Sequence, residues 1–281
     1  MLAPTAPTIN ETAPQGHKRL QRRVLLADPS QEYFVHAPSS CRDGAPIVVA
    51  IHGQSRNADQ QARLLAAHSE ARGAILVAPL FSAEQHPDYQ RLGRVGRGKR
   101  ADIALNLIVA EVAAITGASA ERFCIFGFSG GAQFAHRYTM ANPHRVAGAV
   151  IASAGWYTFP DQAKRYPYGL RMNRRHPGIR FDAEEFLQIP MTVIVGKDDD
   201  SQVGLRRTSR IDREQGTTRV ERARRWVAAM QAAAAAHKLE SKVSYEEVEN
   251  CDHSLRRSIL RGGLGDKAFQ ALLGAPPSST H

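Results

Sequence analysis

Short apolar runs alternate with helical patterns along most of this chain, from Pro46 onward. The runs with strand character are EYFVHAP near residue 34, PIVVAIHG ending at Gly53, AILVAP ending at Pro79, RFCIFG ending at Gly127, VAGAVIAS ending at Ser153, MTVIVG ending at Gly196 and KVSYEEV ending at Val248. Helical patterns with apolar residues at steps of three and four cover 57–73, 101–117, 130–143 and 218–238. Parallel strands joined by right-handed crossover helices produce this alternation. The sequence therefore predicts an α/β fold, a mostly parallel sheet flanked by helices, with ligands bound beyond the carboxyl ends of the strands.

The chain is long enough for one sizeable domain, with 281 residues of which 43% are hydrophobic. We expect a single domain over 23–275 after a disordered tail over 1–22, which has no basic start followed by an apolar block as in a secretory signal. No apolar run is long enough to cross a bilayer. The three cysteines, Cys41, Cys124 and Cys251, form no CxxC pair typical of a zinc site. A soluble, cytoplasmic protein is expected.

The formal net charge is +10, and arginines are concentrated at 91–100, 171–180 and 206–225. Such a surface attracts anions over a long range. The clusters are scattered, however, and no zinc-finger, RNP or helix-turn-helix pattern accompanies them. We therefore expect a solvated basic surface, with neither nucleic acid nor a membrane as a partner. The sequence leaves the oligomeric state open.

The strongest chemical signal is Gly127-Phe128-Ser129-Gly130-Gly131, which lies between an apolar run and a helical pattern. A strand, a tight turn and a helix are the setting in which a G-x-S-x-G motif exposes its serine. Glycines at both ends let the strand and the helix pass closely, while the strained turn presents the serine hydroxyl. The amide of Gly130, at the helix N-terminus, can point at an oxyanion. Ser129 is therefore predicted to be a nucleophile.

A serine nucleophile needs a base and a group that orients the base. Three carboxylates, Asp198, Asp199 and Asp200, follow the strand MTVIV, and an imidazole, His253, follows the strand KVSYEEV. Among the eleven histidines, His253 is the best base because it lies in a loop after the last strand. The serine, the carboxylates and the histidine thus all come at strand ends, in the chain order Ser, Asp, His.

In these residues the chain resembles the α/β-hydrolase superfamily, from about Pro46 to the loop that holds His253. The resemblance implies that the acid is the third residue after the strand-ending glycine, which is Asp199. Asp198 and Asp200 stay open, and either could instead cap the next helix or pair with Arg206. The resemblance also implies that the amide of Gln54, after the pair His52-Gly53, completes an oxyanion hole with Gly130, whereas His52 itself is structural.

The sequences HGQSRNADQ, GFSGGAQFAHRY and VGKDDD are similar to those of polyhydroxybutyrate-depolymerase-like and feruloyl-type esterases. This similarity implies hydrolysis of small carboxylic esters by a Ser-His-Asp triad through an acyl-enzyme, with no cofactor and no metal. Peptide, amide or lactone hydrolysis by the same triad is an alternative, since a fold does not determine the bond that is cleaved. A basic binding protein without catalysis is the alternative from another class.

Residues 154–189 break the alternation with a sequence rich in aromatic residues, Pro and Arg. We expect an insertion over the site, because long irregular segments in compact domains often form lids or binding loops. The alternative is a surface loop whose aromatic side chains pack against one another. Trp156, Tyr157 and Phe159 follow a strand end and are predicted to line a substrate pocket, although they could also be core aromatics.

Overall fold

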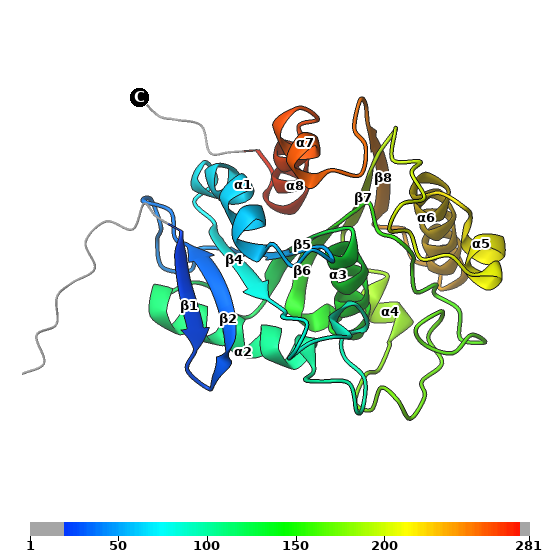
Figure 1. Cartoon of the computed structure of the whole chain (residues 1–281), viewed down its shortest axis with the longest axis horizontal. Coiled ribbons are helices and arrows are strands. Elements are labelled where there is room, and N and C mark those ends of the chain that lie inside the picture. Colours follow the sequence, from blue (N-terminus) through cyan, green and yellow to red (C-terminus); the bar gives the residue numbers. More distant parts are fainter. Residues whose placement is uncertain (1–19, 276–281) are drawn as a thin grey trace, which may run out of the picture.

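The computed structural model describes residues 20–275, and one sheet with helices on both faces dominates this part of the chain (Figure 1). The strands are β1 (Gln21–Leu25), β2 (Asp28–His36), β3 (Ile47–Ile51), β4 (Ile75–Leu80), β5 (Phe123–Phe128), β6 (Val146–Ala152), β7 (Met191–Gly196) and β8 (Val243–Val248). The α-helices are α1 (Ala58–Glu70), α2 (Ala101–Thr116), α3 (Gly130–Ala141), α4 (Ala183–Phe186), α5 (Ser209–Gln215), α6 (Arg219–Ala236), α7 (Leu255–Leu260) and α8 (Leu264–Leu273). Two short 3-10 helices are η1 (Tyr89–Arg91) and η2 (Pro143–Arg145).

The strand order in the sheet is β1-β2-β4-β3-β5-β6-β7-β8. The pairs β1–β2 and β2–β4 are antiparallel, whereas all neighbours from β4 to β8 are parallel. The predicted mostly parallel sheet is therefore confirmed. Because β3, β5, β6 and β7 are parallel neighbours, their carboxyl ends meet along one edge of the sheet.

Two hydrophobic cores lie on opposite faces of the sheet. The first is formed with α2, α3 and α6, through side chains such as Leu105, Phe134 and Trp226. The second is formed with α1, α7 and α8, through side chains such as Leu65 and Phe269. Figure 1 shows α1, α7 and α8 grouped above the sheet and α2 below it. Burial on both faces explains why β3 and β5 are apolar along their whole length.

All seven apolar runs form strands, and the four helical patterns form α1, α2, α3 and α6. The structure adds β1, which begins at Gln21, two residues before the expected domain boundary; residues 1–19 of the expected tail lie outside the described residues. It also adds α5, α7 and α8, which are 7, 6 and 10 residues long. Such short helices span too few turns for a clear periodicity. None of the described helices has the length and apolarity to cross a membrane.

The segment 154–189 has little regular structure apart from α4, as its composition indicated. Its first residues turn into the core, where Tyr157 stacks on Trp226 with ring centroids 5.0 Å apart. The indole nitrogen of Trp226 also donates a hydrogen bond to the carbonyl of Thr158 at 2.7 Å. No residue of this segment lines the cavity at Ser129 itself, whereas residues of 165–176 line a larger neighbouring cavity.

Candidate active site

Ser129 lies in a sharp turn between β5 and α3, with φ 55° and ψ −114°. A positive φ is uncommon for a residue other than glycine, and residues strained in this way cluster at functional sites. The turn is held by a hydrogen bond of 2.8 Å from the Ser129 amide to the carbonyl of Ala152 on β6. A Cβ on Gly131 would lie 1.9 Å from the carbonyl oxygen of Ile51. Only glycine therefore lets α3 begin so close to β3, which is what raises the serine above the sheet.

Ser129, His253 and Asp199 form a continuous hydrogen-bonded line. The Ser129 hydroxyl is 2.8 Å from Nε2 of His253, and Nδ1 of His253 is 2.8 Å from Oδ2 of Asp199. Because a carboxylate only accepts, Nδ1 carries a proton, and a neutral imidazole then accepts the serine proton at Nε2. The structure thus brings together the three residues that the sequence had placed at separate strand ends.

The loops after β7 and β8 hold the acid and the base in place. The amides of Lys197 and Asp198 donate to the carbonyls of Val248 and Cys251, at 2.9 and 3.1 Å, which ties the two loops together. Asp198 and Asp200 are exposed and form no ion pair within residues 20–275, whereas Asp199 is fully buried. Of the three carboxylates, Asp199 is therefore the one that contacts the imidazole.

Arg219 is a site residue that the sequence did not indicate. Its side chain is 2% exposed, and its guanidinium donates to Oδ1 of Asp199 at 3.1 Å, opposite the oxygen that contacts His253. It also donates to the carbonyls of Ser201 and Val203 at 2.7 and 3.1 Å. In the sequence Arg219 is one of many arginines of a basic helix, so no local signal distinguished it.

The amides of Gln54 and Gly130 lie close together beside Ser129. A Cβ on Gly130 would be 3.2 Å from the Gln54 nitrogen. Neither amide donates a hydrogen bond to another group of residues 20–275. The same Cβ would be 2.6 Å from Nε2 of Gln90 and 2.7 Å from the Tyr89 hydroxyl, so these two side chains also border the region. Two unpaired backbone donors beside a serine hydroxyl suit the binding of an oxyanion.

His52 is buried, and both of its ring nitrogens contact backbone groups, which agrees with the structural role expected from the sequence. Its Nε2 accepts a hydrogen bond from the Phe81 amide at 3.0 Å, and Nδ1 is 2.8 Å from the carbonyl of Gly53. Burial lowers the pKa of His52 to about 4, so the imidazole is neutral at physiological pH. His52 thus fixes the start of the loop that presents Gln54.

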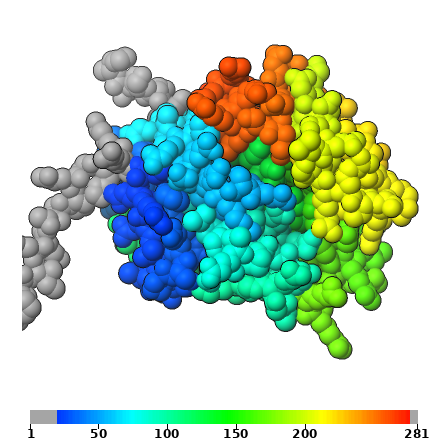
Figure 2. All heavy atoms as spheres, in the orientation of Figure 1, coloured from blue at the N-terminus to red at the C-terminus, as the bar shows by residue number. Residues whose placement is uncertain are grey.

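A cavity of about 450 Å³ opens at Ser129 and is lined mainly by polar groups. Gln54, Gln60, Val203 and His253 are among its lining residues. Figure 2 shows this hollow, where green residues near the end of β5 are visible between cyan, yellow and orange segments. Its walls come from the loops after β3, β5, β7 and β8, in agreement with the expectation that ligands bind at the carboxyl ends of the strands.

The structure does not bring Trp156, Tyr157 and Phe159 to this cavity. Trp156 is 2% exposed and lies under the guanidinium of Arg137, 4.2 Å from the ring centroid. Tyr157 is fully buried against Trp226, and Phe159 packs on the same core. The prediction that these aromatics line the pocket is wrong, because the chain after β6 turns toward the core on the α3 side of the sheet.

No cluster of three or more His, Cys, Asp or Glu side chains among the described residues could hold a metal ion. Cys251, two residues before His253, is fully buried as a free thiol. The side chains linked by hydrogen bonds at the site are the hydroxyl of Ser129, the imidazole of His253, the carboxylate of Asp199 and the guanidinium of Arg219.

The parallel sheet, the strained serine after β5 and the acid and histidine after β7 and β8 define the α/β-hydrolase fold. Solved structures with this fold include poly(aspartic acid) hydrolase-1 from Sphingomonas sp. KT-1, with 25% identity, a TM-score of 0.74, and coverage of 86% of this chain and 93% of that chain. A poly(3-hydroxybutyrate) depolymerase from Bordetella parapertussis has 24% identity and a TM-score of 0.76, and the match covers 94% of this chain and 93% of that chain. An S-formylglutathione hydrolase from Agrobacterium tumefaciens has 14% identity and a TM-score of 0.59, and the match covers 90% of this chain and 94% of that chain. No protein-family model and no curated protein matches the sequence.

Proposed function

We propose that this protein is a serine hydrolase that cleaves carboxylic esters. The observation that carries the proposal is the line from the Ser129 hydroxyl through His253 to Asp199, with both contacts at 2.8 Å. A strained serine turn and two unpaired amides beside it give additional support. The names of the similar structures agree, since they include a poly(3-hydroxybutyrate) depolymerase, a ferulic acid esterase and an acetyl xylan esterase.

In the first half-reaction, Ser129 attacks the ester carbonyl carbon while His253 takes the hydroxyl proton at Nε2. The oxyanion that forms accepts hydrogen bonds from the amides of Gln54 and Gly130, each worth about 3 kcal/mol in the transition state. His253 then gives its proton to the departing alcohol oxygen, which leaves an acyl group on Ser129. Asp199 keeps the imidazole oriented and stabilises its positive charge.

In the second half-reaction, water takes the place of the alcohol. His253 removes a proton from the water molecule, the hydroxide adds to the acyl carbon, and the Ser129 oxygen leaves with the proton from His253. The products are an alcohol and a carboxylic acid, and the enzyme is restored. Besides the substrate and water, the steps use only Ser129, His253, Asp199 and the backbone amides of Gln54 and Gly130.

The test is the hydrolysis of p-nitrophenyl esters of increasing acyl length by the unmodified protein and by Ser129→Ala and Asp199→Asn. Loss of a triad member is expected to lower kcat by about 10⁴-fold or more. Asp198→Asn is the matched control, because Asp198 is an exposed neighbour that makes no side-chain contact with His253. Equal activity of Ser129→Ala and the unmodified protein would overturn the proposal, and absence of turnover on every ester would leave ester cleavage unsupported.

Amide hydrolysis by the same residues is the second candidate, favoured by one similar structure, which is named a poly(aspartic acid) hydrolase. A p-nitroanilide that shares its acyl group with a p-nitrophenyl ester distinguishes the two bonds. A pre-steady-state burst of nitrophenol, equal in amount to the enzyme, is expected for the ester because the acyl-enzyme accumulates. Faster turnover of the anilide than of the ester would place amide hydrolysis first.

A further inference from the structure

A second and larger cavity, of about 820 Å³, lies beside the one at Ser129 and is lined by eight arginines. We call it the arginine cleft. Its arginines come from three segments, 91–94, 165–175 and 206–210, and no acidic side chain lines it. In Figure 2 these segments, coloured teal, light green and yellow, adjoin one another at the lower right of the view. The three arginine-rich stretches that are scattered in the sequence thus contribute to one concave surface.

Most of this positive charge has no carboxylate partner among residues 20–275. Arg165, Arg171, Arg174, Arg175 and Arg206 are exposed and form no ion pair with any carboxylate of residues 20–275. Two other arginines of the cleft share a single aspartate, and the eighth shares a glutamate with a lysine. The charge of the cleft therefore exceeds what the surrounding carboxylates balance.

A buried guanidinium adds further positive charge beneath the cleft. Arg137 is fully buried without a carboxylate partner, and one of its terminal nitrogens has no hydrogen-bond partner among the described residues. Arg137, Arg91 and Arg206 all approach the ring of Trp156, at 4.2, 5.7 and 5.7 Å from its centroid. Burial, together with the charges of Arg206 and Arg94, lowers the pKa of Arg91, which agrees with a strongly positive local potential.

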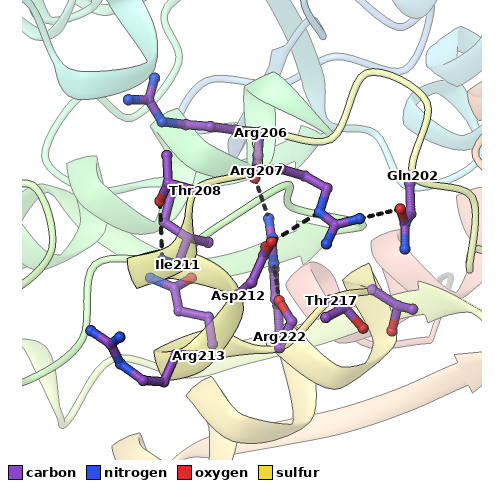
Figure 3. Close-up of polar contacts among 12 residues, drawn as sticks. Gln202, Arg206, Arg207, Thr208, Ile211, Asp212, Arg213, Thr217 and Arg222 are labelled. Atoms are coloured by element: carbon purple, nitrogen blue, oxygen red, sulfur yellow. Dashed lines mark hydrogen bonds and ion pairs between the residues drawn. The ribbon is translucent and has the colours of Figure 1, made fainter.

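The arginine cleft and the cavity at Ser129 are lined by neighbouring residues of one loop. Val203 and Gly204 line the cavity at Ser129, and Arg206, two residues further, lines the cleft. Two residues of extended chain span at most about 7 Å. Figure 3 shows the Arg206 side chain directed away from the contacts among Arg207, Asp212 and Arg222, while Arg222 donates to the Arg206 carbonyl at 2.9 Å. The backbone is thus held in place and the guanidinium is left free for a ligand.

We propose that the arginine cleft binds an extended substrate chain with a carboxylate on successive units, and that Ser129 cleaves ester bonds in this chain. The inference rests on the proposed function, because the reacting group must carry an acyl carbon. Guanidinium groups bind carboxylates through two parallel hydrogen bonds, and several unpaired guanidiniums call for several carboxylates. Mutual repulsion keeps such a chain extended, which suits an elongated site. A nucleic acid offers the charge but has phosphodiesters where Ser129 requires a carbonyl.

Two polyesters with the same backbone test the substrate class. β-Malate oligomers carry a carboxylate on each unit where 3-hydroxybutyrate oligomers carry a methyl group, and a pH-stat follows the acid released from either. At low ionic strength, kcat/KM is expected to be about tenfold or more higher for the malate oligomers, and salt is expected to reduce this preference. An equal or opposite preference would overturn the proposal. Retained hydrolysis of p-nitrophenyl acetate would show that the proposed function still stands.

The double variant Arg171→Gln/Arg206→Gln removes two unpaired charges from the arginine cleft, one from each of two of its segments. Its KM for malate oligomers is expected to rise about tenfold with little change in kcat, because both lost contacts serve binding rather than chemistry. Its kinetics on 3-hydroxybutyrate oligomers are expected to stay unchanged. Arg42→Gln/Arg63→Gln is the matched control, because it removes the same charge from exposed sites that line neither cavity. An equal effect of both variants would overturn the proposal.

Binding to Ser129→Ala, measured by fluorescence anisotropy of a labelled malate oligomer, tests the arginine cleft without any chemistry. The triple variant Ser129→Ala/Arg171→Gln/Arg206→Gln is expected to bind the oligomer more weakly than Ser129→Ala does. This expectation holds whichever kind of bond Ser129 cleaves. Single-stranded RNA is the competing probe. If RNA bound through the same two arginines and the malate oligomer did not bind, the cleft would be a nucleic-acid site and the proposal would be wrong.

Discussion

At the scale of single residues, Arg219 explains how the buried carboxyl group of Asp199 is paired and oriented. Asp199 has no exposed surface, and an isolated charge in such a place is costly. Arg219 occupies one carboxylate oxygen and leaves the other for His253. The same guanidinium donates to the carbonyls of Ser201 and Val203, so it fixes both Asp199 and the loop that follows it. We regard Arg219 as a positioning residue, since it acts on the imidazole only through Asp199.

Arg219→Gln is expected to lower kcat for p-nitrophenyl acetate by about 10- to 100-fold, since small displacements of catalytic groups have effects of this size. KM is expected to change little, because a small acetyl ester does not need Arg219 for binding. Arg219→Lys keeps the positive charge and is expected to restore part of the rate. A parallel loss of activity and folded protein in both variants, seen by circular dichroism, would indicate a purely structural role.

At the scale of secondary-structure elements, the crossing of α3 over β3 depends on the absence of a side chain at one position. The carbonyl oxygen of Ile51 occupies the space that a Cβ on Gly131 would need. Both elements are held on other sides, β3 between two parallel neighbours and α3 in the core with Phe134. Neither element can retreat without disturbing close packing.

Gly131→Ala is therefore expected to lower the free energy of unfolding by about 3 kcal/mol or more, or to prevent folding. Gly148→Ala is the matched control on β6, because a Cβ there would meet its nearest atoms at an ordinary 3.8 Å. Its expected effect is within about 1 kcal/mol. Urea unfolding of both variants makes the comparison, and equal stabilities would contradict the expected steric conflict.

The elements were largely predictable because β2 to β8 each coincide with an apolar run. β1 was not, since its sequence QRRVL contains two arginines and only one buried residue, Leu25. Ser129, Asp199 and His253 could be predicted as a group because each follows a parallel strand. Trp156 could not be placed, because an aromatic residue after a strand can turn to either face of the sheet. Partners such as Arg219 depend on a contact across the fold that no local pattern records.

At the scale of the whole molecule, several histidines are buried in the neutral form. Burial lowers the pKa of His52 and of His176 to about 4, and it lowers the pKa of His136 as well. In an unfolded chain these imidazoles titrate near pH 6.5. Below that pH the unfolded chain binds protons that the folded chain does not bind, so acid favours unfolding.

The free energy of unfolding is therefore expected to fall between about pH 6.5 and pH 5, where most carboxylates are still ionised. Each buried histidine contributes a slope of up to about 1.4 kcal/mol per pH unit in this interval. Urea titrations at several pH values measure the slope directly. A constant free energy of unfolding over the interval would show that these imidazoles accept protons in the folded protein.

The arginine cleft also has a consequence for the folded protein on its own. Like charges gathered in one concavity repel one another, and this repulsion is present only when the chain is folded. Counterions that collect there relieve it, and multivalent anions do so more strongly than chloride because each one screens several guanidiniums at once. The stability of the folded protein thus depends in part on the anions in solution. Two buffers of equal pH and ionic strength are expected to give different free energies of unfolding when one contains a multivalent anion and the other contains chloride.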